Sequence, residues 1–336
     1  MASVEKGRIC VTGAGGFVAS WVVNLLLSKG YVVHGTVRQP QDDKYAHLRK
    51  LDKAPQNLKL FKADLLNYDS MLSAIEGCSG VFHVASPVPS TISSNPEARI
   101  SHALEVLEPA VKGTLNVLKA CLEAKVQRVV FVSSVAAVVM NPRWPKGQVM
   151  DETCWSDKEY CRTTKNWYCL SKTEAETEAL EFGKKTGLDV VAVCPTFVFG
   201  PILQSSINAS SLALIKLLKG LNNVIMNAGG NESVENKLRM IVDVRDVAEA
   251  LLLAYEKPEA EGRYICTAHA IKTRNLVDKL RSIYPHNNYP NNFVDVEEEV
   301  TLSSEKLLQR LGWRYRSLDE TLIDSVKSYQ DNGLLD

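Results

Sequence analysis

The sequence lacks the patterns that mark metal-binding, secreted and membrane proteins. Its eight cysteines include no Cys-x-x-Cys pair, so neither a zinc knuckle nor a secreted disulfide framework is indicated. The apolar run at residues 21–27 is interrupted by Asn24 and is far too short to cross a bilayer. The 39 basic and 39 acidic residues balance, which argues against nucleic acid or an anionic membrane as the main partner.

The N-terminal residues lead almost at once into a predicted strand, which leaves no room for a signal peptide. We therefore expect a cytoplasmic protein that holds no metal. Its 336 residues suffice for a large core and a second lobe. The sequence does not indicate an oligomeric state.

Short β-branched runs alternate with longer amphipathic runs in the first half of the chain. The predicted strands are residues 8–11, 32–37, 58–61, 80–84, 128–132 and 189–193, and the predicted helices are residues 17–28, 68–76, 102–124 and 168–186. This alternation predicts βαβ units, and the almost continuously apolar strands predict a parallel sheet covered on both faces. The expected fold class is α/β, a doubly wound Rossmann sheet.

The pattern changes after Pro195. We expect a dinucleotide-binding domain over residues 1–194 and a smaller substrate lobe over 195–336, with segments near 236–270 returning to the first domain. The predicted elements are a helix at 208–221, a polar loop at 222–235, a strand and a helix within 240–255, and two helices in the tail around the Pro/Asn-rich stretch 284–292.

A glycine-rich turn separates the first strand from the first helix. Gly13, Gly16 and Ala19 follow the G-x-x-G-x-x-[GA] spacing of short-chain dehydrogenases. Glycines allow a tight turn and bring backbone N–H groups and the helix N-terminus to a pyrophosphate. An ordinary strand-to-helix turn is the alternative, but the position in the chain favours a dinucleotide. The predicted contacts in this turn are Gly13, Gly15, Gly16, Phe17 and Val18.

The end of the second strand distinguishes the two nicotinamide cofactors. An NAD enzyme would carry Asp or Glu about 20 residues after the turn, to bind the ribose hydroxyls. This chain instead carries Arg38, with Lys44 shortly after, and a 2′-phosphate requires such cations. We therefore predict NADP(H). Asp64 and Leu65, after the third strand, are placed to meet the adenine.

The strongest catalytic signal is a tyrosine four residues before a lysine. Tyr168 and Lys172 share one face of a predicted helix, and Ser134 ends the fifth strand. We predict that Tyr168 protonates a carbonyl oxygen to which Ser134 donates a hydrogen bond. Lys172 would hold the nicotinamide ribose, and its ammonium together with the positively charged oxidised nicotinamide would lower the tyrosine pKa from about 10 to near 7. Asn116 is a candidate to steady a water chain behind the lysine.

These motifs resemble the extended short-chain dehydrogenases of plants, most closely the cinnamoyl-CoA reductase and dihydroflavonol reductase group. The resemblance covers nearly the whole chain and includes the Asn-Trp-Tyr-Cys signature at 166–169 and the segments 11–17, 83–87, 109–114, 151–157, 207–210 and 242–247. It implies NADPH-dependent reduction of an aromatic carbonyl. It also implies cofactor contacts at Val84, Ala85, Ser86, Pro195, Thr196 and Val198, and a redox-responsive pair, Cys161 and Cys169, whose ability to form a bridge here is open.

The chain departs from the family at a position that matters for the substrate. Relatives that reduce CoA thioesters carry a histidine where this chain has Ala213, whereas Lys216 and Arg263 match two further residues that are thought to hold CoA. We therefore expect reduction of a hydroxycinnamaldehyde to its alcohol, as in an atypical cinnamyl-alcohol dehydrogenase. The alternatives are reduction of hydroxycinnamoyl-CoA thioesters and reduction of a dihydroflavonol or another ketone. A catalytically dead dinucleotide sensor would typically lack Tyr168 or Lys172.

Overall fold

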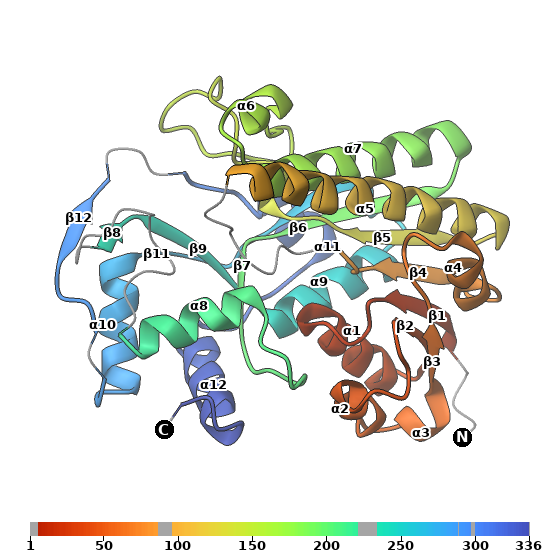
Figure 1. The fold of residues 1–336 in the computed structure, drawn as a ribbon, viewed down its shortest axis with the longest axis horizontal. Helices are drawn as coiled ribbons and strands as arrows, with labels where there is room; N and C mark the ends of the chain where they lie inside the picture. Colours follow the sequence, from red (N-terminus) through yellow and green to blue (C-terminus); the bar gives the residue numbers. More distant parts are fainter. Residues whose placement is uncertain (1–5, 87–95, 221–233, 288, 297–299, 336) are drawn as a thin grey trace.

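The computed structural model describes residues 6–86, 96–220, 234–287, 289–296 and 300–335, with the backbone alone for 96–106. Seven parallel strands form its central sheet, in the spatial order β10-β6-β5-β4-β1-β2-β3. They are β1 (Lys6–Thr12), β2 (Tyr31–Val37), β3 (Leu58–Lys62), β4 (Gly80–His83), β5 (Arg128–Val132), β6 (Asp189–Pro195) and β10 (Gly262–Cys266). The doubly wound parallel sheet predicted from the sequence is confirmed (Figure 1).

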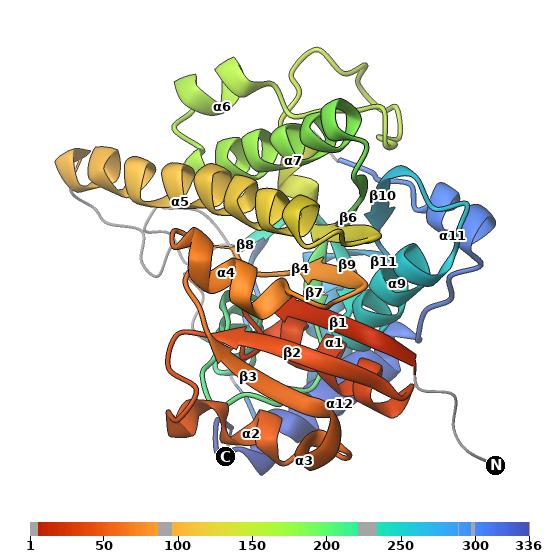
Figure 2. The ribbon, with the colours of Figure 1, turned by 90° about the vertical axis from the view of Figure 1, so that its right-hand side faces the viewer.

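Helices cover both faces of this sheet (Figures 1 and 2). On one face lie α1 (Phe17–Ser28), α9 (Val244–Glu256) and α11 (Glu305–Leu311), and on the other lie α4 (Tyr68–Ile75), α5 (Pro96–Glu123) and α7 (Trp167–Thr186). Alternate residues of β5 supply the two cores: Val130 and Val132 pack with α1 and α9, whereas Val129 and Phe131 pack with α5. Because successive side chains of a strand point to opposite faces, a central strand buried on both must be apolar throughout.

Short helices complete the region around β2 and the approach to α7. They are η1 (Asp43–Tyr45), α2 (Ala46–Arg49), α3 (Ala54–Asn57), η2 (Val135–Ala137) and α6 (Lys158–Thr163). The last of these precedes the cap of α7, where Asn166 accepts a hydrogen bond from the backbone N–H of Cys169. Gly187 ends α7 in the left-handed conformation.

A second core lies beyond Pro195. It contains the three-stranded sheet β11-β9-β7, the pair β12-β8 and three helices. The elements are β7 (Phe197–Phe199), α8 (Ala209–Leu218), β8 (Val234–Asn236), β9 (Leu238–Asp243), β11 (His269–Lys272), α10 (Thr273–Ile283), β12 (Phe293–Asp295) and α12 (Leu318–Asp331). The predicted loop 222–235 falls mostly outside the described residues, and the domain division at residue 195 stays a prediction.

The tail differs from the expectation of two helices. The described residues after 272 contain three, because α11 forms between α10 and α12. This seven-residue helix buries Leu307 and Leu311 in the core beneath α9. So short an apolar pattern gives little helical signal by itself. No helix in the described ranges is both long and apolar enough to cross a membrane.

Candidate active site

Tyr168, Lys172 and Ser134 come together at the carboxyl end of β5. Tyr168 and Lys172 lie one turn apart on α7, and Ser134 caps η2 by accepting from the backbone N–H of Ala136 at 3.2 Å. The Ser134 side chain lies close enough to Tyr168 to act on the pKa of its hydroxyl group. The Lys172 ammonium donates to the carbonyl of Val132 at 3.4 Å. The structure thus brings the three residues together, while their catalytic roles stay predictions.

The tyrosine is not acidified by the side chains around it. Burial raises the pKa of Tyr168 above its ordinary value, and the nearby Ser134 side chain opposes that rise only in part. The predicted lowering of this pKa toward 7 also counted the charge of the oxidised nicotinamide and stays a prediction. The protein's own side chains leave the phenol protonated, because burial disfavours the phenolate. A phenol that stays protonated at neutral pH is the form that donates a proton in the reductive direction.

Lys172 shows the complementary effect. Its side chain is 5% exposed. Burial lowers the pKa of Lys172 to about 8, against opposing contributions from Cys194 and Glu176. The lysine is thus the group of this site whose charge changes closest to neutral pH.

We expect the pH dependence of reduction to follow Lys172. Its ammonium is charged below pH 8 and neutral above, whereas burial lowers the pKa of neighbouring His83 to about 3. kcat/KM with NADPH should be constant up to about pH 8 and then fall by about tenfold per pH unit. The measurement is a pH–rate profile, with circular dichroism at each pH to exclude unfolding. A profile that stays flat to about pH 10 would contradict the assignment.

The glycine turn has the geometry of a phosphate cradle. Gly13 has φ +65°, and a Cβ built on it would lie 3.0 Å from the Cβ of Ala85 on the neighbouring strand end. The N-cap of α1 is Gly16, which has no side chain to accept from the first N–H groups of the helix. Those groups and the positive end of the helix dipole are therefore available to an anion. Phe17, by contrast, is buried, and Val18 packs against the core.

Tyr45 covers the same turn and is not among the sequence candidates. A Cβ built on Gly15 would lie 2.3 Å from the ring of Tyr45, so the bare glycine backbone lets that ring lie directly on the turn. Lys44 lies beside it, 5.0 Å from the ring centroid, and forms an ion pair with Asp42 at 3.1 Å. The signal that could have indicated Tyr45 is its position: it is an aromatic residue directly after Lys44, a predicted phosphate-binding lysine.

A buried network orders the ends of β1 and β4. The Thr12 hydroxyl accepts from the backbone N–H groups of Val84 and Ala85, so its proton points to Nδ1 of His83 at 2.9 Å. His83 Nε2 then carries the proton and donates to Thr114 at 3.2 Å. The neutral ring ties α5 to both strands, and holds the half-buried residues Val84, Ala85 and Ser86 at this edge.

The predicted adenine side is built from two loops. Arg38 follows β2 and is exposed. Asp64 accepts from the backbone N–H of Leu66 at 2.9 Å and so stabilises its own turn, while Leu65 packs against Gly113 of α5. Asn116 donates to the carbonyl of Leu65 at 2.9 Å. This contact places the Asn116 amide against the β3–α4 loop, and its role behind Lys172 stays a prediction.

The remaining predicted cofactor residues lie at the end of β6 and in the segment that follows it. Pro195 ends that strand and is buried, and Thr196 donates its backbone N–H to the carbonyl of Cys266 at 3.1 Å. Val198 is half-buried on β7 and pairs with Val242. These residues link the large sheet to the second core.

Comparison with known proteins assigns this architecture. A family model, the NAD dependent epimerase/dehydratase family, matches residues 9–266. The chain belongs to this family. It is 44% identical to cinnamoyl-CoA reductase 1 of Petunia hybrida over 339 residues, which cover 100% of this chain and 96% of the relative. It is also 39% identical to the bifunctional dihydroflavonol 4-reductase/flavanone 4-reductase of Malus domestica, covering 98% and 92% of the two chains.

Solved structures of family members agree with this assignment. Vestitone reductase from alfalfa is 31% identical with a TM-score of 0.81, and yeast methylglyoxal/isovaleraldehyde reductase Gre2 in complex with NADPH is 26% identical with a TM-score of 0.80. Each match covers 98% of this chain and 100% of the other. The resemblance to extended short-chain dehydrogenases is thereby confirmed. The chain is an NADP-dependent oxidoreductase.

The family cofactor NADP(H) fits the residues present. The cradle at Gly13 is one that a side chain would fill, and the uncapped start of α1 suits a pyrophosphate. Arg38 supplies an exposed cation at the end of β2, where an NAD enzyme carries an acid. When bound, the reduced cofactor supplies hydride.

The preference for NADPH over NADH is expected to depend on Arg38. Arg38→Ala removes a charge-assisted contact to the 2′-phosphate and should raise the KM for NADPH by about 10- to 100-fold, leaving the KM for NADH unchanged. Steady-state kinetics with both cofactors measure this ratio. Lys50→Ala, a change at another exposed cation of the same region, is the control. An unchanged ratio for Arg38→Ala would show that this arginine does not read the phosphate.

Of the two residues expected to hold CoA, Arg263 does not offer its side chain for it. Arg263 is 6% exposed, and all five of its N–H donors are used within the protein. Their acceptors are the Glu176 carboxylate and the carbonyls of Ala137, Glu152 and Cys154. The predicted role of Arg263 in CoA binding is therefore wrong, because the arginine is an internal ion-pair partner. Ala213 is buried on α8, and Lys216 is half-buried one turn further along.

The cysteines of the Asn-Trp-Tyr-Cys region are reduced in this structure. Cys161 lies on α6 and Cys169 on α7, and both are buried free thiols. Burial raises the pKa of Cys161 and raises that of Cys169 to about 12. Thiols of high pKa react slowly, because the thiolate is the nucleophile. Formation of a redox bridge between the two stays a prediction.

Proposed function

We propose that the protein reduces the acyl carbonyl of hydroxycinnamoyl-CoA thioesters with NADPH, releasing the aldehyde and CoA. The observation that carries this proposal is the 44% identity to cinnamoyl-CoA reductase 1 of Petunia hybrida over essentially both full lengths. It replaces the aldehyde preference expected from Ala213, since the relatives named as cinnamoyl-CoA reductases support the thioester more directly.

The geometry at β5 supports carbonyl reduction. A substrate oxygen placed against Tyr168 and Ser134 would accept hydrogen bonds from both hydroxyl groups. As negative charge develops on that oxygen, Tyr168 would transfer its proton and the Lys172 ammonium would favour the charge. For a thioester, the tetrahedral adduct then loses the thiol of CoA and leaves an aldehyde.

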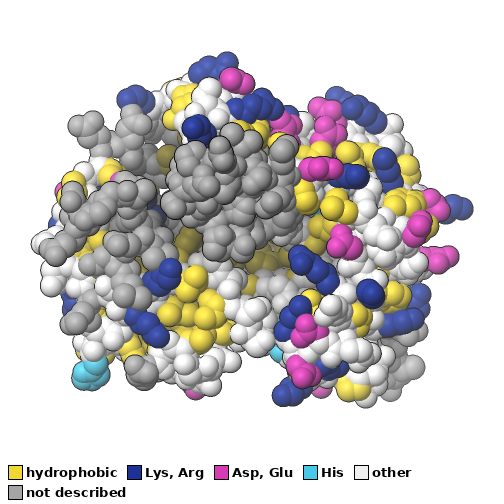
Figure 3. Space-filling view, in the orientation of Figure 1, with side chains coloured by type: hydrophobic (Ala, Val, Ile, Leu, Met, Phe, Trp, Pro, Cys, Tyr) yellow, Lys and Arg dark blue, Asp and Glu magenta, His cyan; other side chains and the backbone are white. Residues whose placement is uncertain are grey.

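The surface around α8 supports an aromatic substrate. Figure 3 shows hydrophobic side chains exposed on the face that carries α8, on which Leu212 is 37% exposed. Phe197, which follows Thr196, is 39% exposed and stacks edge-on against Phe199. Basic and acidic side chains are interspersed elsewhere on the described part of this face (Figure 3).

A direct rate comparison tests the proposal. Purified protein is supplied with NADPH and either feruloyl-CoA or coniferaldehyde, and kcat/KM is measured for each. A higher value for the thioester is expected. Faster reduction of coniferaldehyde, with little or no turnover of the thioester, would overturn the proposal.

The aldehyde is the second candidate, and a specific observation favours it. At the three positions where relatives are thought to hold CoA, this chain has Ala213, the internally paired Arg263 and Lys216, so that only Lys216 offers a side chain for it. A dihydroflavonol or another ketone is a third candidate, supported by the Malus domestica relative.

Introducing a histidine at position 213 is expected to separate these candidates further. If α8 contacts CoA, Ala213→His should lower the KM for feruloyl-CoA by about tenfold, because it adds one hydrogen bond to a charged group. The kcat for coniferaldehyde is the internal control and should stay unchanged. A folded variant with an unaltered thioester KM would show that α8 does not hold CoA.

A further inference from the structure

Glu176 is a fully buried acid that no step of the proposed reaction uses. It is 0% exposed and lies on α7 one turn after Lys172. Burying a carboxylate away from water is costly unless it is paired and hydrogen-bonded. The position of this charge, beside the predicted catalytic lysine, therefore calls for an explanation.

The Glu176 carboxylate joins three adjacent strands of the sheet to α7. It accepts from the hydroxyl of Ser133 at 2.5 Å and from Nε of Arg263 at 2.6 Å. The thiol of Cys194 lies 3.5 Å from both carboxylate oxygens. Ser133 follows β5, Cys194 is on β6 and Arg263 is on β10, which are neighbours in the sheet.

Each of these contacts lies next to a residue of the site. Ser133 precedes Ser134, and Cys194 precedes Pro195. Arg263 also donates to the carbonyl of Ala137, in the short helix that Ser134 caps. Loss of the carboxylate would release Ser133, Cys194 and the Nε–H of Arg263 together, because these three share one acceptor.

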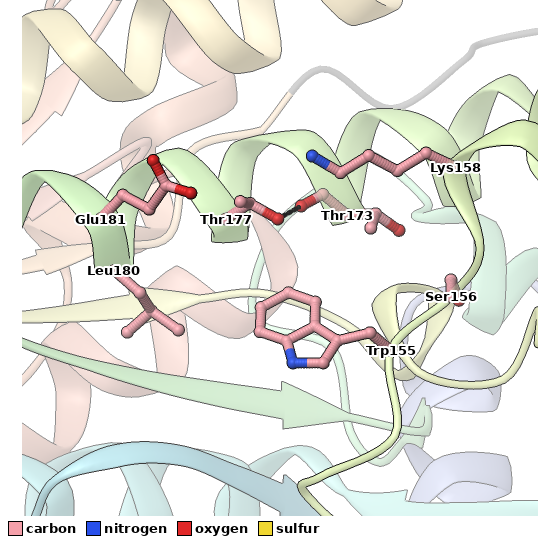
Figure 4. Close-up of a pocket in the computed structure, with 7 residues that line it drawn as sticks. All are labelled: Trp155, Ser156, Lys158, Thr173, Thr177, Leu180 and Glu181. Atoms are coloured by element: carbon pink, nitrogen blue, oxygen red, sulfur yellow. Dashed lines mark hydrogen bonds between the residues drawn. The ribbon is translucent and has the colours of Figure 1, made fainter.

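The arginine itself is held from its other side. Its guanidinium lies 3.5 Å from the centroid of the Trp155 ring. Trp155 in turn lines a cavity of about 310 Å³ beside α7, together with Ser156, Lys158, Thr173, Thr177, Leu180 and Glu181 (Figure 4). Stacking on Trp155 and five hydrogen bonds hold the Arg263 guanidinium in one orientation. Because Glu176 is paired with this guanidinium, its carboxylate is held in place as well.

We propose that Glu176 is a positioning residue: through Ser133, Cys194 and Arg263, its carboxylate fixes Lys172 and Ser134 relative to each other. The inference rests on the proposed reduction at Ser134, Tyr168 and Lys172. The carboxylate also places one negative charge near the lysine, so that Lys172 and Arg263 are not two uncompensated buried cations.

Glu176→Gln tests this role, because it keeps the size of the side chain and removes the charge. The kcat is expected to fall by about 10- to 100-fold with little change in the KM for NADPH, since misplacement of reacting groups lowers turnover. The alkaline limb of kcat/KM should also move down by about one pH unit, because the ammonium loses its neighbouring anion. The other groups that face Lys172 are the Cys194 thiol and the neutral His83. A packing role alone would leave the pH limb in place.

Ser133→Ala gives a second test, which keeps the ion pair and removes only the 2.5 Å hydrogen bond. We expect kcat to fall by about tenfold without a shift of the pH limb. Glu181→Gln, on an exposed acid of the same helix, is the matched control and should behave as wild type. Wild-type kcat and pH limb in folded Glu176→Gln would overturn the inference. If that variant does not fold, wild-type kcat in Ser133→Ala would do so. If the wild-type protein reduces neither feruloyl-CoA nor coniferaldehyde with NADPH, the proposed function is refuted instead.

Discussion

Tyr168→Phe is expected to lower kcat by about 10²- to 10⁴-fold, the range in which a positioned general acid contributes. The substitution removes the hydroxyl that lies near Ser134 and keeps the ring. NADPH binding should change little, because the cradle at the glycine turn is untouched. Single-turnover reduction and fluorescence titration of NADPH measure the two effects separately.

Tyr160→Phe is the matched control for this variant. Tyr160 is 38% exposed on α6, one helix before Tyr168, and its replacement should leave kcat unaltered. If Tyr168→Phe keeps its kcat within about tenfold of wild type, the proton comes from elsewhere and the proposed mechanism is wrong.

Gly13→Ala is expected to lower both stability and cofactor affinity. At φ +65° an alanine costs about 1–2 kcal/mol, and its Cβ would lie 3.0 Å from that of Ala85, a crowding that costs about 1–3 kcal/mol more. Relief of that contact moves the turn away from β4. Thermal unfolding and NADPH titration should therefore both show a loss.

Gly187→Ala separates the two costs. Gly187 has φ +79° at the end of α7, and a Cβ built on it would meet nothing within 4 Å. This control should lose only about 1–2 kcal/mol of stability and bind NADPH as wild type does. If Gly13→Ala also binds NADPH as wild type, the turn is not the phosphate cradle.

Much of the first half of the fold is predictable from local pattern. The helix predicted at 17–28 is observed as α1, and the strand predicted at 128–132 is observed as β5. Both are long or strongly apolar, and their flanking residues mark the ends. The strand β10 (Gly262–Cys266) lies in the segment 236–270 that was expected to return to the first domain, but its place beside β6 at the edge of the sheet is a contact between distant segments, which local pattern does not give.

In the candidate site, too, local pattern predicts some features, whereas others depend on contacts between distant segments. Motif spacing indicated Tyr168, Lys172 and Ser134, and the structure brings the three together. Burial raises the pKa of Tyr168, an effect that motif spacing does not reveal, since the degree of burial around a phenol is a sum over several chain segments. Arg263 was expected to bind CoA because local pattern does not reveal its ion-pair partner: Glu176 lies 87 residues away in the chain.

By itself, the sequence determined the fold class, the cofactor and the residues that meet at β5, because each depends on spacing within one turn, strand or helix. Tertiary structure decided what those residues experience: a protonated tyrosine, a lysine of lowered pKa and a buried Glu176–Arg263 pair beneath them. The reason is physical. Burial and charge pairing depend on distances between segments far apart in the chain, and those distances exist only after folding.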